Sequence, residues 1–198
     1  MTQRPCVSSL RITIRNSDTL DGYSFVSLSD LMVSFDEGKV RKALESFEPY
    51  REGESDQFLR ENAISMEKRD LSRTYLALAS DKKTILGFVT VGMKCLLIPK
   101  ENLLSRSELK DMNIDSKTGV AQAYLFGQLA RSEKAPNGFG IDLVDFALTI
   151  FRNSKKNVGC HMVRLDCTDE LIDYYEKRGF RLIRKNEDGE LNQMMIFI

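Results

Sequence analysis

The chain has 198 residues, of which 42% are hydrophobic and 29% charged, as is typical of one compact domain. Its 29 basic and 29 acidic residues cancel, so no overall field draws it to nucleic acid or to an anionic membrane. Four scattered cysteines and a single histidine, His161, argue against a disulfide framework and a metal site. The absence of a signal-peptide pattern and of a bilayer-spanning apolar window predicts a cytoplasmic protein with no membrane partner.

We expect residues 1–198 to form a single domain whose first third contains two strands and two polar helices. Residues 10–15 alternate apolar and polar side chains, as a half-buried strand does, and residues 23–28 form a second candidate strand. Helical spacing follows over residues 37–47 and again over residues 55–68. The role of residues 1–34 stays open.

Strand signals dominate the middle of the chain. Residues 74–79 and 84–98 flank a polar turn and are predicted to form an antiparallel hairpin. A short amphipathic helix is expected over residues 101–111, followed by an apolar strand over residues 120–130.

A cationic loop with two closely spaced glycines, Gly138 and Gly140, follows that strand and enters a helix over about residues 141–153. Glycines lack a Cβ atom, so the main chain can come close to a ligand. The unpaired amides of the next helical turn attract anions. The pattern indicates a phosphate site, although such glycine pairs are also common in ordinary turns.

The last third is predicted to contain a strand, a helix and a closing hairpin. Residues 161–167 form the strand, at whose start His161 is expected to be packed or hydrogen-bonded. Thr168 offers an N-cap hydroxyl for the helix, and Gly179 offers its stop. Residues 180–185 and 191–198 form the hairpin. Strand, phosphate-type loop, helix and strand in this order indicate an α/β fold in which the two strands are parallel.

Two motifs at their separation resemble the GNAT superfamily of N-acetyltransferases. One is the glycine loop, and the other is Tyr174-Tyr175-Glu176-Lys177-Arg178-Gly179-Phe180, which resembles the superfamily's aromatic-Tyr-x-x-x-Gly-Phe ending. The resemblance covers about residues 57–198. It implies an α/β fold with a mixed, mostly antiparallel central sheet flanked by helices, in which a parallel pair is splayed at the acetyl-CoA site.

A narrower group, the acetyltransferase toxins of bacterial toxin-antitoxin modules, resembles residues 58–63, 71–76 and 125–130. Its members acetylate the amino group of an aminoacyl-tRNA. The resemblance implies an amine acceptor, with tRNA, a ribbon-helix-helix antitoxin and a second copy of the chain in a homodimer as candidate partners. Two alternatives stay open: acetylation of a small amine or a protein N-terminus, and an inactive module that binds CoA or a partner.

The resemblance also implies roles for individual residues. Tyr175 is the candidate catalytic residue, a general acid that protonates the CoA thiolate when an amine attacks the thioester directly. The main chain at Leu129 to Arg131 is expected to meet the pantetheine arm, and amides from Asn137 to Ile141 the pyrophosphate. The implied acetyl-CoA contacts are Leu129, Ala130, Arg131, Lys134, Pro136, Asn137, Gly138, Phe139, Gly140, Ile141, Thr168 and Tyr174.

One position departs from the superfamily pattern. Ala135 stands where the loop usually carries Gln or Arg, so a side-chain contact to phosphate is missing. Lys134 and Arg131 are candidates to replace it, and without them a modest loss of affinity is expected. For Tyr175, the alternative role is packing on the helix face beside Ile172.

The acceptor can be narrowed by the absence of acidic residues between Val120 and Ala130, where many relatives that act on lysine or polyamines carry a carboxylate. A lysine amine, with a pKa of about 10.4, needs such a base, whereas an α-amine, at about 7.7 to 8, is already partly neutral. An α-amine is therefore favoured, with Glu133, Glu61 or a water chain as alternative bases.

Cationic side chains near two helix ends are candidates to hold an RNA backbone. Solvated helix ends would show the same pattern, because cations complement the dipole there. The candidates are Arg152, Lys155, Lys156, Lys177, Arg178, Arg181, Arg184 and Lys185.

Overall fold

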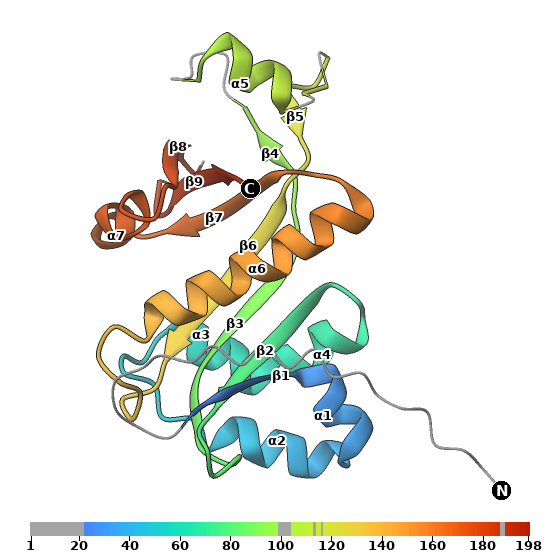
Figure 1. The fold of residues 1–198 in the computed structure, drawn as a ribbon, viewed down its shortest axis with the longest axis vertical. Helices are drawn as coiled ribbons and strands as arrows, with labels where there is room; N and C mark the ends of the chain where they lie inside the picture. Colours follow the sequence, from blue (N-terminus) through green and yellow to red (C-terminus); the bar gives the residue numbers. More distant parts are fainter. Residues whose placement is uncertain (1–21, 99–103, 113, 116, 187–188) are drawn as a thin grey trace, which may run out of the picture. The chain divides into compact units, whose positions relative to one another are not determined.

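The computed structural model describes residues 22–98, 104–112, 114–115, 117–186 and 189–198 (Figure 1). The strand predicted over residues 10–15 lies outside these ranges. Contacts divide the chain into two units, one made of Met1–Val89 with Leu129–Leu143 and the other of Thr90–Gln128 with Val144–Ile198. Two strands and one helix run from one unit into the other.

Seven strands form one mixed sheet in the order β1-β2-β3-β6-β7-β9-β8. The pair β6 and β7 is parallel, whereas β1 with β2, β7 with β9, and β8 with β9 are antiparallel. This confirms the mostly antiparallel α/β sheet with one parallel pair. The strands are β1 (Ser24–Ser27), β2 (Ser72–Leu78), β3 (Ile85–Met93), β6 (Tyr124–Arg131), β7 (Met162–Cys167), β8 (Arg181–Lys185) and β9 (Asn192–Phe197).

The first unit packs helices against β2 and β3 around a core that contains Leu44, Leu59 and Phe88. The helices predicted over residues 37–47 and 55–68 are present, the second with a π-helical turn in its middle. Between β1 and α2 lies a helix that the sequence patterns did not predict. The helical elements are α1 (Leu28–Ser34), α2 (Glu37–Glu45), α3 (Glu54–Gln57), η1 (Phe58–Asn62) and α4 (Ala63–Lys68).

The second unit differs from the prediction at two points. The strand expected over residues 84–98 is broken, because β3 ends at Met93 and a separate two-stranded sheet of β4 (Leu96–Leu97) and β5 (Val120–Ala121) follows. The predicted cap at Thr168 is also wrong. Its hydroxyl makes no cap bond, because the residue precedes a 3-10 turn, η2 (Asp169–Leu171), in which its carbonyl accepts from the Leu171 amide at 3.1 Å.

Two further helices of the second unit lie within the predicted ranges, although the second begins later than predicted. α5 (Arg106–Asp111) lies within the predicted 101–111, and α7 (Ile172–Glu176) is followed by Gly179 in the left-handed conformation, with φ of 86°. That φ confirms the predicted glycine stop. Among the described residues, no helix has the length and apolar character needed to cross a membrane.

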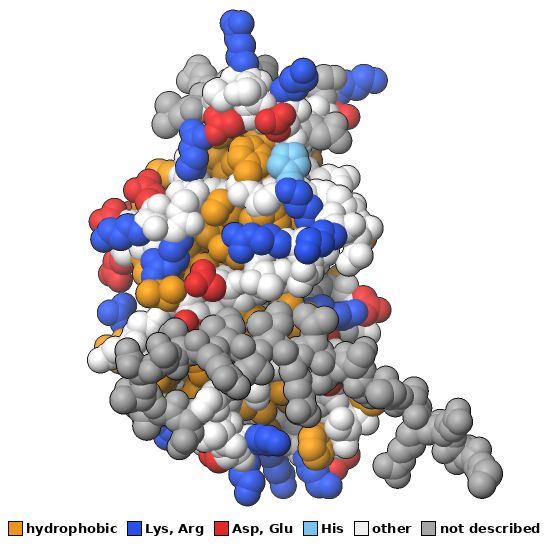
Figure 2. Space-filling model, in the orientation of Figure 1, with side chains coloured by type: hydrophobic (Ala, Val, Ile, Leu, Met, Phe, Trp, Pro, Cys, Tyr) orange, Lys and Arg blue, Asp and Glu red, His pale blue; other side chains and the backbone are white. Residues whose placement is uncertain are grey.

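His161 is packed, as predicted. Its ring stacks on Phe197 with centroids 5.3 Å apart and an interplanar angle of 27°. Figure 2 shows this histidine at the surface, with Lys and Arg side chains gathered nearby.

Candidate functional site

The parallel strands β6 and β7 pair only at their beginning. Their register joins Tyr124 to Val163 and Leu125 to Arg164, and the described residues continue it no further. Beyond Leu125 the facing edges of the two strands are therefore separate. Such an edge presents unpaired N–H and C=O groups to which an extended ligand can add like a strand. The splayed parallel pair expected from the sequence is present.

Gly127 fixes β6 at the point where it leaves β7. A Cβ atom at this position would lie 2.4 Å from Thr90 Oγ1, too close for any side chain. The same oxygen accepts a hydrogen bond from the Gln128 amide at 2.6 Å. The buried Thr90 hydroxyl thus takes the place of a side chain at residue 127 and ties β6 to β3.

The glycine loop, residues 135–141, lies in the first unit and leads from β6 into α6 (Gly140–Val158). Gly138 has φ of 82°, a conformation that favours glycine. The Phe139 amide donates to the Pro136 carbonyl at 3.2 Å, and the Ile141 amide to the Gly138 carbonyl at 2.9 Å. Those two amides are engaged within the loop.

Three other amides of the loop, at Asn137, Gly138 and Gly140, donate no hydrogen bond to any residue that the structure describes. They lie at the N-terminal end of α6, where the helix dipole favours an anion. Of the amides from Asn137 to Ile141, these three are the ones that the described residues leave available to a phosphate.

The position that departs from the superfamily pattern is packed rather than open. Ala135 is 7% exposed, and its amide donates to the Ser132 carbonyl at 3.2 Å. Phe139 is also buried, with its ring centroid 4.9 Å from that of Tyr23. The side chains of Ala135 and Phe139 therefore face the interior of the first unit rather than solvent.

The segment Glu48–Tyr50, which joins α2 to α3, lies against the chain just before the loop. The Tyr50 amide donates to the Arg131 carbonyl at 2.9 Å, and the Glu133 amide to the Glu48 carbonyl at 3.2 Å. Pro49 and Ser132 form a β-bridge between them. The carbonyl of Arg131 is thus occupied by protein, and its main chain is only partly available to a ligand.

Both cations proposed to replace the missing phosphate contact are engaged by the same segment. The Arg131 guanidinium lies 3.5 Å from the centre of the Tyr50 ring, and Lys134 Nζ is 2.8 Å from a Glu48 oxygen. The hydrogen bond between Lys134 and Glu48 raises the pKa of Lys134 and lowers the pKa of Glu48. A phosphate would have to compete with Glu48 for Lys134.

A surface depression of about 450 Å³ adjoins this segment in the first unit. Glu133, one of the two alternative base residues, lines this depression. Glu61, the other, lies in η1 and accepts a hydrogen bond from Gln57 Nε2 at 3.1 Å. The lining residues are Glu45, Ser46, Phe47, Glu48, Pro49, Glu52, Arg60 and Glu133.

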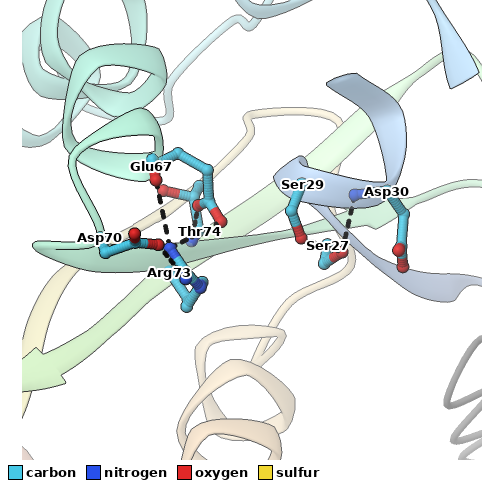
Figure 3. Close-up of polar contacts among 7 residues, drawn as sticks. All are labelled: Ser27, Ser29, Asp30, Glu67, Asp70, Arg73 and Thr74. Carbon is cyan, nitrogen blue, oxygen red and sulfur yellow. Dashed lines mark hydrogen bonds and ion pairs between the residues drawn. The ribbon is translucent and has the colours of Figure 1, made fainter. Parts of the chain in front are cut away.

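A buried carboxylate lies where α4 meets β2 (Figure 3). Glu67 accepts a hydrogen bond from the Thr74 amide at 2.9 Å and lies 3.4 Å from Arg73 Nη1. Arg73 also donates to Asp70 at 2.5 Å. Burial raises the pKa of Glu67, against the lowering effects of the Thr74 hydrogen bond and the Arg73 charge. This cluster joins the helix to the strand.

Tyr175 belongs to the second unit and is 8% exposed. Its ring centroid lies 6.4 Å from that of Phe126 on β6 and 5.6 Å from that of Phe180. Burial raises the pKa of Tyr175 well above its usual value; Tyr174 and Cys167 add to this, and Arg178 opposes it. The hydroxyl therefore stays protonated at neutral pH. Its ring is packed, as the alternative role requires, and it also reaches the strand that diverges from β7.

The other residues of this unit that were predicted to contact acetyl-CoA are Tyr174 and Thr168. The Arg178 guanidinium lies 3.5 Å from the centre of the Tyr174 ring, and the Tyr174 main-chain carbonyl accepts a hydrogen bond from Arg178 Nη1 at 2.5 Å. Thr168 is exposed. Several proposed RNA-binding cations have protein partners, among them Arg181 with Glu108 and Lys185 with Asp169.

Comparisons with solved structures show the fold. A tyrosine-to-phenylalanine mutant of KacT has a TM-score of 0.66 at 19% identity, covering 86% of this chain and 93% of that one. AtaT in complex with acetyl-methionyl-tRNAfMet has a TM-score of 0.64 at 18% identity, with the same coverage. AtaTR bound with acetyl-CoA has a TM-score of 0.61 at 17% identity, covering 86% and 91%. The chain has the GNAT fold of these toxin acetyltransferases.

Comparisons of sequence are sparser. No family model matches the chain. A curated relative, the transcription factor tau 138 kDa subunit of Saccharomyces cerevisiae, is 24% identical over 178 residues. The match covers 87% of this chain but only 14% of the relative.

Proposed function

We propose that the protein is an acetyl-CoA-dependent N-acetyltransferase that transfers the acetyl group directly to an amine. The observation that carries this proposal is the separation of β6 from β7 beyond Leu125. The strand β6 runs on into a loop in which three amides donate to none of the described residues. A strand edge can bind the pantetheine arm, and helix N-terminal amides can bind the pyrophosphate. The GNAT fold of AtaT and KacT supports the same reaction class.

The proposed cofactor contacts follow from which groups are unengaged. Leu129 and Ala130 carry the main-chain contacts to pantetheine, with a smaller share for Arg131, whose carbonyl accepts from Tyr50. The pyrophosphate lies on the amides of Gly138 and Gly140 together with that of Asn137. The remaining predicted contacts, at Lys134, Pro136, Phe139, Ile141, Thr168 and Tyr174, stay proposals.

Tyr175 is the proposed acid. When the amine attacks the thioester, the C–S bond breaks and negative charge develops on sulfur, where a hydroxyl can donate its proton. The raised pKa of Tyr175 keeps that proton in place at neutral pH. Because a tyrosine is also less acidic than an ordinary thiol, the hydrogen bond to the developing thiolate is expected to contribute more than complete proton transfer.

The proposed acceptor is the α-amine of an aminoacyl-tRNA, which would make the protein the toxin of a toxin-antitoxin module. AtaT is seen with acetyl-methionyl-tRNAfMet and, as a mutant, with the C-terminus of its antitoxin AtaR. The absence of acidic residues between Val120 and Ala130 points in the same direction. A ribbon-helix-helix antitoxin and a second copy of the chain complete the proposed partners.

A second candidate is a module that binds CoA or a partner without turnover. The curated relative is a transcription factor subunit, and the two cations that precede the loop in the sequence, Arg131 and Lys134, are engaged by Tyr50 and Glu48. A small amine or a protein N-terminus stays the enzymatic alternative for the acceptor.

Release of free thiol from acetyl-CoA, measured with a panel of amines and aminoacyl-tRNAs, separates these candidates. The proposal predicts release that depends on the amine and falls on Tyr175→Phe. Tyr124→Phe is the matched control, since Tyr124 is a buried tyrosine of the same unit whose hydroxyl bonds the Gly159 carbonyl. No release with any amine would sink the enzymatic proposal. Harmless overexpression, with no repressor gene beside this one, would count against the toxin.

A further inference from the structure

We infer that Asp166 on β7 binds the ammonium group of the amine acceptor. Arg164 positions the Asp166 carboxylate, and in the free protein the Lys94 ammonium occupies the position that the acceptor ammonium would take. The inference rests on the proposed function and deepens it, because it assigns a binding group to the acceptor. All three residues belong to the second unit.

Asp166 borders the gap between the two parallel strands. The last residue of β7 in register with β6 is Arg164, opposite Leu125, and Asp166 follows two positions later on the same face. Alternation puts both on the face of Met162, which belongs to the same hydrophobic cluster as Met112 at the end of α5. Leu165 and Cys167 point to the opposite face, where the nearness of Cys167 is one cause of the raised pKa of Tyr175. The carboxylate and the tyrosine therefore approach the strands from opposite faces.

Arg164 holds the carboxylate in one orientation. Its side chain is only 4% exposed, and Nη2 donates to both oxygens of Asp166, at 2.5 and 2.7 Å. Nη1 donates to the Cys95 carbonyl at 2.8 Å, which anchors the guanidinium to the segment after β3. A buried guanidinium with these partners fixes the orientation of the Asp166 carboxylate. The side of the carboxylate that faces Lys94, here called its outer side, is not occupied by Arg164.

Lys94 shows that an ammonium is attracted to that outer side. Its Nζ lies 3.7 Å from Asp166 Oδ2, and the side chains of Lys94 and Asp166 are 57% and 17% exposed. The contact is an ion pair without a hydrogen bond, so it is weak and easily exchanged. An acceptor ammonium can replace Lys94 Nζ, because the long lysine side chain can retreat into water.

The class of acceptor follows from this exchange. A primary amine binds to Asp166 as the cation and then loses one proton to water. The neutral amine still donates an N–H to the carboxylate and keeps its lone pair for attack on the thioester. The carboxylate missing from residues 120–130 is thus supplied by the neighbouring strand, in a binding role.

Two analogues of an aminoacyl-tRNA end test the inference. One is aminoacyl-adenosine with a stable amide link, and the other carries a hydroxyl group in place of the α-amine. Calorimetric titration of the full chain, with and without CoA, should show that wild type prefers the amine. Asp166→Asn should remove that preference and leave binding of the hydroxyl analogue unchanged. Lys94→Gln should strengthen amine binding by up to about fivefold, because the competing cation is gone.

The two variants are expected to change amine affinity in opposite directions, which separates a binding role of Asp166 from a structural one. Asp166→Asn leaves Arg164 without a charged partner, so its thermal stability is measured alongside, and Lys94→Gln provides a readout in a protein whose buried pair is intact. Equal affinity of wild type for both analogues, or weaker amine binding by Lys94→Gln, would overturn the inference. The measurement of thiol release from acetyl-CoA tests the proposed function separately, since the protein could acetylate amines without using Asp166.

Discussion

Lys134 and Glu48 form an ion pair of 2.8 Å that joins the residue just before the glycine loop to the connection between α2 and α3. The sequence suggested that Lys134 binds phosphate in place of the side chain that Ala135 does not provide. In the structure this lysine already has an anionic partner, and binding of a phosphate has to displace it.

Replacement of Glu48 should strengthen acetyl-CoA binding. Glu48→Gln frees Lys134 for the cofactor phosphates, so the dissociation constant is expected to fall a few fold at low salt. Because both groups are exposed, the gain should shrink as ionic strength rises. Titration at two salt concentrations measures it. Glu45→Gln, which lines the same depression without contacting Lys134, is the control and should bind as wild type does.

Replacement of Tyr175 should slow turnover and leave cofactor binding nearly intact. A positioned general acid contributes roughly 10²-fold or more to the rate, so Tyr175→Phe is expected to lose about that much in kcat. Steady-state kinetics together with the dissociation constant for CoA provide the measurement. If the variant kept wild-type kcat, the tyrosine would have a packing role only.

The pH profile of turnover should have no alkaline limb from Tyr175 below pH 10. Its raised pKa means that the hydroxyl loses its proton only above the ordinary range. Any fall in rate between neutral pH and about 10 must then come from another group. Profiles of wild type and Tyr175→Phe should keep the same shape in this range, at different heights. A limb that disappears in the variant would refute the assignment.

Gly127→Ala should destabilise the fold through one contact. The new Cβ would lie 2.4 Å from Thr90 Oγ1, and forcing apart such packed groups costs about 1–3 kcal/mol. Thr90→Ala should relieve part of that cost in the double variant. A double-mutant cycle by denaturant unfolding measures the coupling. Additive effects of the two changes would show that the clash does not occur.

Glu67 should make stability depend on pH above the ordinary range of glutamate. Its pKa is raised from 4.5 in the folded state, so the native protein binds a proton there more tightly than the unfolded chain does. Its contribution to stability is then greatest below pH 4.5 and is lost as pH rises through the folded pKa. Glu67→Gln should flatten that part of the stability profile, measured by denaturant unfolding at several pH values. An unchanged slope would contradict the raised pKa.

Local patterns were enough to predict most elements of the sheet and the parallel pair. They failed where a few residues decide the conformation. The short helix α1 depends on the Ser27 hydroxyl accepting from the Asp30 amide, and Thr168 enters a 3-10 turn rather than an α-helix. The roles of the individual site residues stay predictions.

Pairings between distant segments could not be predicted from local patterns. Neither the contact of Glu48 with Lys134 nor that of Lys94 with Asp166 leaves a periodic signal, because each joins two separate stretches of chain. The alternation of Arg164 and Asp166 within an apolar strand was the one visible hint of the second pair.

The π-helical turn η1 takes up one residue more than an α-helical turn at the same place would. Deletion of one residue from Phe58–Asn62 would therefore close η1 to an α turn and leave the rotation of α4 about its axis nearly unchanged. Because an α-helix advances by about 100° per residue, deletion of Ala63 or Ile64 would instead turn Glu67 away from the Thr74 amide. The helix thus tolerates the loss of a residue in η1 better than a loss in α4, where the buried carboxylate would be misplaced.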